Sequence, residues 1–287
     1  MTRNCLALFA MTIAADSALA SGRPQAPVFA SRVDTVRVDV SVRQGGRALE
    51  GLAATDFEVL DNGVRQQVDF AALDQMPVNV VLTLDMSGSV KGARLAQLQE
   101  AGARLVGMLG PAETAAVVAF TELVTIKSGF TADKATLLSA LQQSADGTDT
   151  ALTDATHAAL VLGGSRTGRP LVIVFSDGAD TASFLSSDLV LDTARRAGPV
   201  AYAVASVRDG PNGFLDNLVR LTGGRRLEIS SLERLSDAFA EILSESRERY
   251  LLSYTPTGVP AGGWHEVIVR VPGRRAEVRA RPGYLAP

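Results

Sequence analysis

The sequence predicts an α/β fold, in which a doubly wound, mostly parallel sheet is inserted between two β segments that pair as a small β-sandwich. Three observations predict it. Residues 78–84 and 171–175 are apolar runs that barely alternate with polar residues, as in central strands buried on both faces. Around these runs, short strands alternate with amphipathic helices, as in βαβ units. On either side, in residues 31–76 and 249–287, the pattern changes to strands alone.

The composition is that of an ordinary globular protein and bounds the class of partner. The 287 residues are enough for one large domain or two modest ones. The net charge of −3 and the 5% of aromatic residues provide neither a basic surface nor stacking platforms, so we expect no nucleic-acid partner.

The first twenty residues have the features of a signal peptide. Arg3 precedes a short apolar core at residues 5–15, and residues 18–20 form a small-x-small cleavage site. The core is too short to cross a bilayer, and no later segment reaches that length. We therefore expect an exported protein, periplasmic or secreted, with a flexible lead at residues 21–30. Its only cysteine, Cys5, would leave with the signal, which excludes thiol chemistry in the mature chain.

The N-terminal β segment covers residues 31–76. Valines alternate with polar residues over 36–42, which predicts a strand with one buried face. Asp61-Asn62-Gly63 lies between strands expected at 57–60 and 64–70, a strong hairpin signal. Strands this few and this short are only marginally stable alone.

The predicted α/β domain covers residues 77–248. Gly110-Pro111 ends its first helix, and Ser230 and Glu233 have capping-box spacing before its last one. We expect strands at 78–84, 115–120, 124–127, 171–175, 200–207 and 226–229. We expect helices from Ser89 to residue 109 and at 133–143, 154–162, 190–197, 214–221 and 235–243.

The C-terminal β segment, residues 249–287, contains alternating strands at 250–254, 267–271 and 276–280. Neither β segment can bury much surface by itself. Because the ends of a domain tend to lie close together, we expect this segment to pair with residues 31–75 in one small sandwich.

A candidate metal site begins where the first apolar strand ends, at Asp85-Met86-Ser87-Gly88-Ser89. In open α/β sheets, ligands bind at this end of the strands. Carboxylate and hydroxyl oxygens suit Mg²⁺, Mn²⁺ or Ca²⁺. Neutral hydroxyls leave the charge of an ion uncancelled, so the ion would attract an outside carboxylate. The alternative is an ordinary strand-to-helix turn in which Asp85 and Ser87 cap the helix.

Two further loops carry oxygen ligands. The second apolar strand ends in Ser176-Asp177-Gly178, and residues 147–155 form a Gly/Thr/Asp loop that opens a helix. If the two apolar strands are neighbours in the sheet, these loops face one another. Asp180 is expected to cap a nearby turn.

In this order, the three motifs resemble the metal-ion-dependent adhesion site of the von Willebrand factor A (VWA) domain. The resemblance covers residues 77–246 and implies a Rossmann-like fold with a divalent ion, Mg²⁺ first, with Mn²⁺ or Ca²⁺ as alternatives. It implies five metal ligands: Asp85, Ser87, Ser89, Thr150 and Asp177. Thr148 lies in the same loop and is the alternative to Thr150, which the following Ala-Leu-x-Asp-Ala favours.

The flanking segments resemble a bacterial exported subgroup of VWA-related proteins, through residues 56–63, Tyr254-Thr255-Pro256 and residues 281–284. The resemblance implies adhesion or assembly: the ion keeps an open position that an exposed Asp or Glu of a protein partner fills. Helix N-termini near the site would also favour an anion.

Three alternatives remain: a metal-dependent hydrolase, a metal-free structural domain, and an accessory component of an envelope-assembly or ATPase-linked complex. We expect no enzyme and no catalytic residues. The only histidines, His157 and His265, fall in different predicted domains. Residues 163–170 have Arg-Pro where a phosphate-binding loop needs Lys-Ser/Thr.

Overall fold

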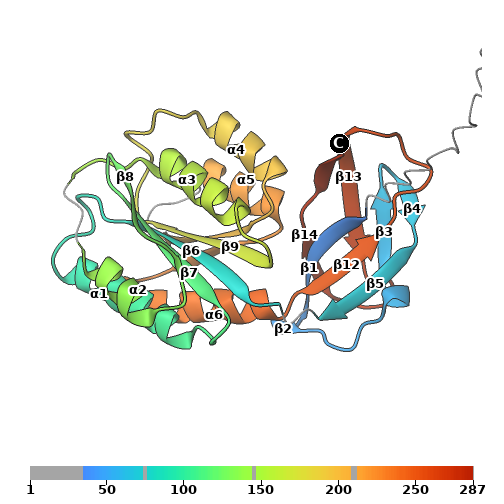
Figure 1. Cartoon of the computed structure of the whole chain (residues 1–287), viewed down its shortest axis with the longest axis horizontal. Coiled ribbons are helices and arrows are strands. Elements are labelled where there is room, and N and C mark those ends of the chain that lie inside the picture. The colour runs from blue at the N-terminus through green and yellow to red at the C-terminus, as the bar shows by residue number, and fades with distance from the viewer. Residues whose placement is uncertain (1–34, 74–75, 144–146, 208–211, 287) are drawn as a thin grey trace, which may run out of the picture. The chain divides into compact units, whose positions relative to one another are not determined.

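A computed structural model describes residues 35–73, 76–143, 147–207 and 212–286 of the chain. The expected signal peptide and the lead at residues 21–30 lie outside the described residues. The described chain contains a helix-covered parallel sheet and two smaller antiparallel sheets (Figure 1). This architecture confirms the predicted fold class. No helix among the described residues is long and apolar enough to cross a membrane.

The large sheet has six strands, and all neighbouring pairs are parallel except the last. In spatial order they are β11 (Arg226–Ile229), β10 (Val200–Ser206), β9 (Arg169–Ser176), β6 (Val78–Asp85), β7 (Thr114–Phe120) and β8 (Val124–Thr131). Only β8 runs antiparallel, as an edge strand beside β7.

Strand β6 is buried at every position because both faces of the sheet are covered. Val80, Leu82 and Leu84 belong to one apolar core, and Val81 belongs to the other. The first core is closed by α1 (Ala93–Met108), α2 (Lys134–Gln142) and α6 (Leu235–Arg247), and the second by α3 (Leu152–Gly164), α4 (Ser187–Arg196) and α5 (Gly213–Thr222). Figure 1 shows the two groups of helices below and above the sheet.

The two apolar strands β6 and β9 are direct neighbours, with Leu84 opposite Phe175. Helix α1 follows β6 on one face, and α4 follows β9 on the other. The strand order therefore reverses between β6 and β9, and a crevice for a ligand is expected at their carboxyl ends. The three predicted loops are expected to face one another if the two apolar strands are neighbours, and these strands are neighbours.

The two β segments pair with each other, as predicted. One sheet contains β14 (Glu277–Ala280), β1 (Val36–Gln44), β12 (Tyr250–Tyr254) and β5 (Val68–Leu73), with β2 (Arg47–Ala48) beside β1. The other contains β15 (Gly283–Ala286), β13 (Gly263–Arg270), β3 (Glu58–Asp61) and β4 (Val64–Gln66). Both sheets contribute to one apolar core, as in a β-sandwich.

The predicted hairpin turn at Asp61-Asn62-Gly63 forms, but the strand predicted after it is interrupted. The hairpin turn between β3 and β4 has positive φ at Asn62 (47°) and Gly63 (80°), as a two-residue turn of this kind requires. The prediction of one continuous strand over 64–70 is wrong. The strand ends at Gln66, whose side-chain amide forms hydrogen bonds with the backbone of Thr257. As a result, β4 and β5 belong to different sheets. Strand β15 was not anticipated.

The expected capping box before the last helix is also wrong. The side chain of Ser231 makes no capping hydrogen bond, and a 3₁₀ turn (Leu232–Arg234) precedes α6. The side chain of Leu232 is buried and packs in the core as part of this turn, and helix α6 begins after it, at Leu235.

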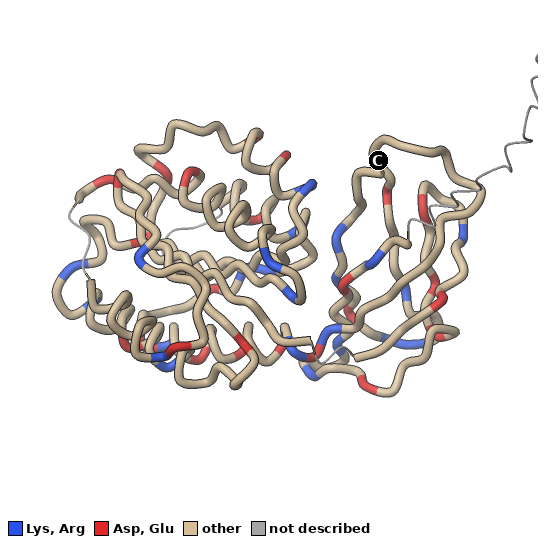
Figure 2. The backbone as a smooth tube through the Cα atoms, viewed as in Figure 1, with Lys and Arg blue, Asp and Glu red and all other residues tan. Residues whose placement is uncertain are grey.

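Arginines and carboxylates form a buried network at the amino end of the parallel sheet. Arg169, the first residue of β9, bonds the carbonyl oxygens of Ser246 and Arg249 at 2.8 and 3.1 Å and pairs with Asp39 of β1 at 3.0 Å. Glu245 of α6 accepts hydrogen bonds from further members of this network. Across the described residues, Figure 2 shows acidic and basic residues interspersed.

Glu245 is 1% exposed and accepts four hydrogen bonds. Its donors are Tyr202 Oη (2.7 Å), Arg279 Nη2 (2.6 Å), Arg225 Nε (2.8 Å) and Ser41 Oγ (3.3 Å). Burial alone would raise the pKa of Glu245, but Arg279, Tyr202 and Arg225 outweigh it and lower the pKa from 4.5 to about 2.

Candidate metal centre

Asp85, the last residue of β6, is completely buried and is held by two of the three predicted loops. Its Oδ1 accepts from the backbone N–H of Ser87 at 3.0 Å, and its Oδ2 accepts from the hydroxyl of Ser176 at 2.7 Å. Burial raises the pKa of Asp85; bonds from Ser87 and Ser176 oppose this rise, and the charge of Asp177 adds to it. The carboxylate is thus fixed in place but not neutralised.

Ser87, Ser89 and Asp177 lie together, although the serines and the aspartate are about ninety positions apart. The hydroxyl oxygens of Ser87 and Ser89 are 3.3 Å apart, and Ser89 Oγ donates to Asp177 Oδ1 at 2.6 Å. Adjacent ligands of an octahedral Mg²⁺, each about 2.1 Å from the ion, lie about 3 Å from one another. The observed spacing of these oxygens is therefore close to what one ion requires.

The 147–155 loop touches the Asp-x-Ser-x-Ser loop through Thr148 and the Asp177 turn through Thr150. The backbone N–H of Gly88 donates to Thr148 O at 3.4 Å, and a Cβ at Gly88 would lie 3.2 Å from that oxygen. Thr150 is 6% exposed, and its Oγ1 lies 4.0 Å from where a Cβ on Gly178 would be. The Thr148 hydroxyl belongs to an exposed residue and lies 3.5 Å from Asp149.

Arg94 is a member of the cluster that the sequence did not reveal. Its Nη2 pairs with Asp177 Oδ2 at 2.7 Å; the Asp177 side chain is 2% exposed and that of Arg94 is 50% exposed. An arginine in the first turn of a helix carries no sequence signal of such a contact. Ser176, which lies in the third motif, was not assigned its bond to Asp85 either.

The alternative interpretation of the first motif, as a helix cap, is wrong. Helix α1 begins at Ala93 with Gly92 as its N-cap, and no side chain caps it. Asp85 instead bonds Ser87 and Ser176, as described above. Asp180 does act as a local cap: it accepts from Thr153 and from the N–H of Ser183.

The chemistry of the cluster is that of hard oxygen donors. Within the described parts of the chain, no three His, Cys, Asp or Glu side chains gather where they could hold a metal. The predicted set has two carboxylates and three hydroxyls, which suits Mg²⁺, Mn²⁺ or Ca²⁺. His157 contacts Thr193 of α4, and His265 contacts Asp61 of β3, so neither bonds to this cluster.

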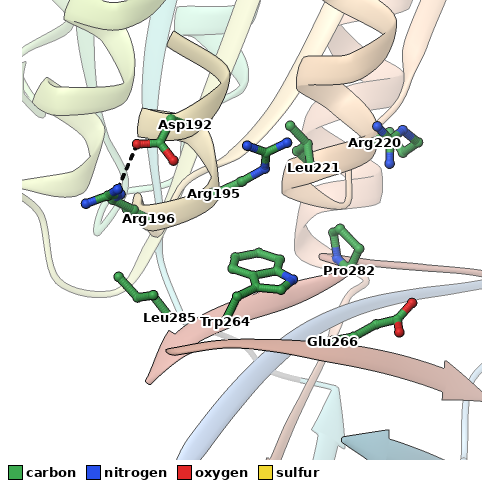
Figure 3. A pocket seen from close by; sticks show the side chains of 9 residues that line it. All are labelled: Asp192, Arg195, Arg196, Arg220, Leu221, Trp264, Glu266, Pro282 and Leu285. Atoms are coloured by element: carbon green, nitrogen blue, oxygen red, sulfur yellow. Dashed lines mark ion pairs between the residues drawn. The ribbon is translucent and has the colours of Figure 1, made fainter. Parts of the chain in front are cut away.

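A hollow of about 560 Å³ lies away from this cluster, beside α4 and α5 (Figure 3). Nine residues of α4, α5 and the β-sandwich region line it: Asp192, Arg195, Arg196, Arg220, Leu221, Trp264, Glu266, Pro282 and Leu285. Its Asp192 is already paired with Arg196 at 2.9 Å. We place the candidate site at the carboxyl ends of β6 and β9 instead, because the buried, incompletely neutralised carboxylates are there.

Comparison with known families finds one match within the α/β part of the chain. Residues 80–179 match the model of the von Willebrand factor type A domain. The matched segment lies within the α/β part of the chain and contains all three motifs. No curated protein matches the sequence.

Solved structures with this fold are distant in sequence. A von Willebrand factor type A protein from Catenulispora acidiphila is 14% identical (89% of this chain, 75% of that chain, TM-score 0.55). Proximal thread matrix protein 1 from the mussel byssus, in a structure with a zinc-occupied metal-ion-dependent adhesion site (MIDAS) motif, is 18% identical (64% of this chain, 49% of that chain, TM-score 0.54). The PilB minor pilin of Streptococcus sanguinis, as its D319A mutant, is 12% identical (61% and 62%, TM-score 0.50).

At these identities the likeness shows the fold alone. The chain also spans only about half the length of the mussel protein.

Proposed function

We propose that this chain is an exported, metal-dependent protein-binding module for adhesion or assembly. A divalent ion, Mg²⁺ by preference, would be held at the carboxyl ends of β6 and β9 and would bridge to an exposed Asp or Glu of a partner protein. The predicted signal peptide supports export, to the periplasm or beyond the cell. The observation that carries the proposal is the convergence of Ser87, Ser89 and Asp177 within hydrogen-bonding distance.

Each residue has a distinct role in the proposed site. Ser87, Ser89 and Thr150 would contact the ion directly, and Asp85 and Asp177 would act directly or through water. The near-buried Thr150 hydroxyl beside Gly178 supports Thr150 over the exposed Thr148. The ion would supply the positive charge that the partner carboxylate binds; the protein orients it through the bonds from Ser87 and Ser176 to Asp85.

We propose binding without catalysis. Hydrolysis at a metal needs a general base near the attacking water. Both histidines are engaged in other parts of the fold, and the two carboxylates of the cluster would be occupied in holding the ion. A turnover assay over phosphoesters and peptides tests this part of the proposal, and any metal-dependent turnover that Ser87→Ala abolishes would refute it.

Calorimetry with MgCl₂ tests the metal site itself. We expect the wild-type chain to take up one ion, and Ser87→Ala to bind it at least about tenfold more weakly. Ser165→Ala is the matched control, because that exposed hydroxyl bonds only the Leu162 carbonyl at the end of α3. Absence of uptake by the wild type, or equal uptake by Ser87→Ala, would refute the site.

A further inference from the structure

Large apolar side chains are exposed on the loops that follow the parallel strands, at the same edge as the candidate metal centre. Phe184 is 93% exposed and Leu123 is 68% exposed, the two highest values among the large hydrophobic residues described. Leu123 follows β7 and Phe184 follows β9, the strands on either side of β6. The metal centre therefore has an exposed apolar residue on each flank.

The loop that carries Phe184 is held rigidly against the site. Asp154 accepts from the backbone N–H groups of Phe184 (3.0 Å) and Leu185 (2.9 Å). The carbonyl oxygen of Thr150 accepts from the N–H groups of Thr181 (2.9 Å) and Ala182 (3.1 Å). The backbone of this loop is thus bonded both to helix α3 and to a predicted metal ligand.

The turn that carries Leu123 is fixed to the same segment from the other side. The N–H of Ala151 donates to Thr121 O at 2.7 Å, and the N–H of Thr148 donates to Glu122 Oε2 at 3.1 Å. Both apolar residues are therefore positioned by contacts to residues 148–151.

A single exposed apolar residue is common and needs no explanation. Two such residues on pinned loops beside one polar centre are different, because their backbone is already ordered and little further ordering entropy is lost on binding. Apolar groups around a charged contact exclude water and so strengthen the contact. Arg94, half exposed beside Asp177, adds positive charge and favours an acid at the centre.

We infer that Leu123 and Phe184 are contact residues for the partner. The occupant of this surface is a protein segment in which one acidic residue is flanked by apolar residues, not a run of acidic residues. The acid reaches the metal centre, and the apolar residues cover Leu123 and Phe184. This inference rests on the proposed function and specifies the partner that the site recognises.

The test selects a phage-displayed random peptide library on the full mature chain in MgCl₂ and elutes with EDTA. We expect enriched peptides with an Asp or Glu flanked by apolar residues. Phe184→Ser and Leu123→Ser should each bind these peptides about tenfold or more weakly. Val161→Ser is the matched control: it is 56% exposed near the far end of α3 and should bind them like wild type.

Calorimetry with MgCl₂ separates this inference from the proposed function. Phe184→Ser and Leu123→Ser should keep wild-type Mg²⁺ affinity. If the wild type takes up no Mg²⁺, the proposed function fails. If Mg²⁺ binds but EDTA elutes no peptides, or elutes peptides without apolar flanks, or the eluted peptides bind Phe184→Ser and Leu123→Ser as well as wild type, the inference fails while the metal site stands.

Discussion

Two buried polar clusters at opposite ends of one parallel sheet differ in how their carboxylates are neutralised. At the amino end, Glu245 has two arginines and the Tyr202 hydroxyl as partners. At the carboxyl end there are two carboxylates, Asp85 and Asp177, but only one arginine: the half-exposed Arg94, which pairs with Asp177. In the first cluster the carboxylate is neutralised by residues of the chain, and the second has an excess of negative charge.

This difference separates a structural role from a binding role. A buried charge is costly unless it is paired, so a closed network contributes to the folded state and binds nothing further. A cluster with unneutralised carboxylates and neutral hydroxyls would instead attract a cation from outside. Four predictions, in decreasing order of expected effect, test this difference.

Removing the central carboxylate of the amino-end cluster should have the largest effect. Glu245→Ala removes the buried carboxylate that Arg225, Arg279 and the Tyr202 hydroxyl share, and we expect a loss of about 3–5 kcal/mol in the free energy of unfolding, measured by urea denaturation. Glu241→Ala is the control, because its carboxylate pairs with the same Arg225 but is half exposed; it should cost less than about 1 kcal/mol. Equal losses in the two variants would mean that burial does not matter here.

Acid should weaken the same cluster. Because the pKa of Glu245 is lowered from 4.5 to about 2 on folding, its contribution to stability is fully present above pH 4.5 and is lost as the pH falls towards 2. The shift corresponds to about 3 kcal/mol. Urea denaturation at pH 6, 4 and 2.5 should show this loss in the wild type and a flatter profile in Glu245→Gln.

The carboxyl-end cluster should respond in the opposite way. Asp85→Asn keeps an acceptor for the Ser87 N–H, and its NH₂ can donate to the Ser176 hydroxyl in place of the original bond, while a buried negative charge is removed; stability in EDTA should therefore change by less than about 1 kcal/mol. Affinity for Mg²⁺ should fall at least about 100-fold in calorimetry. A large loss of stability in EDTA would show that this cluster, too, is mainly structural.

Arg94 should oppose the ion. It already pairs with Asp177, so Arg94→Ala should increase Mg²⁺ affinity about fivefold, near the lower end of usual coupling between two ligands of one site. Arg104→Ala, on the exposed side of the same helix, is the control and should leave the affinity unchanged. Weaker Mg²⁺ binding in Arg94→Ala would assign Arg94 a positioning role instead.

Much of the fold could be predicted because its signals are local. The apolar run at 78–84 and the Asp-Asn-Gly turn are set by burial and backbone conformation within a few residues. The break after Gln66 could not be predicted, because the bonds to Thr257 join residues 191 positions apart. The same holds for the failed capping box before α6, where packing of Leu232 competes with the local pattern.

The sequence alone was enough to predict the order of strands and helices, the burial of β6 and β9, and the oxygen-bearing residues that follow these two strands. Only the tertiary structure shows that these two strands are neighbours, that Arg94 pairs with Asp177, and that the backbone N–H of Phe184 is bonded to Asp154 of α3. The physical reason is range: periodicity and turn chemistry act over a few residues. Neutralisation of a buried charge depends instead on which distant segments the fold brings together.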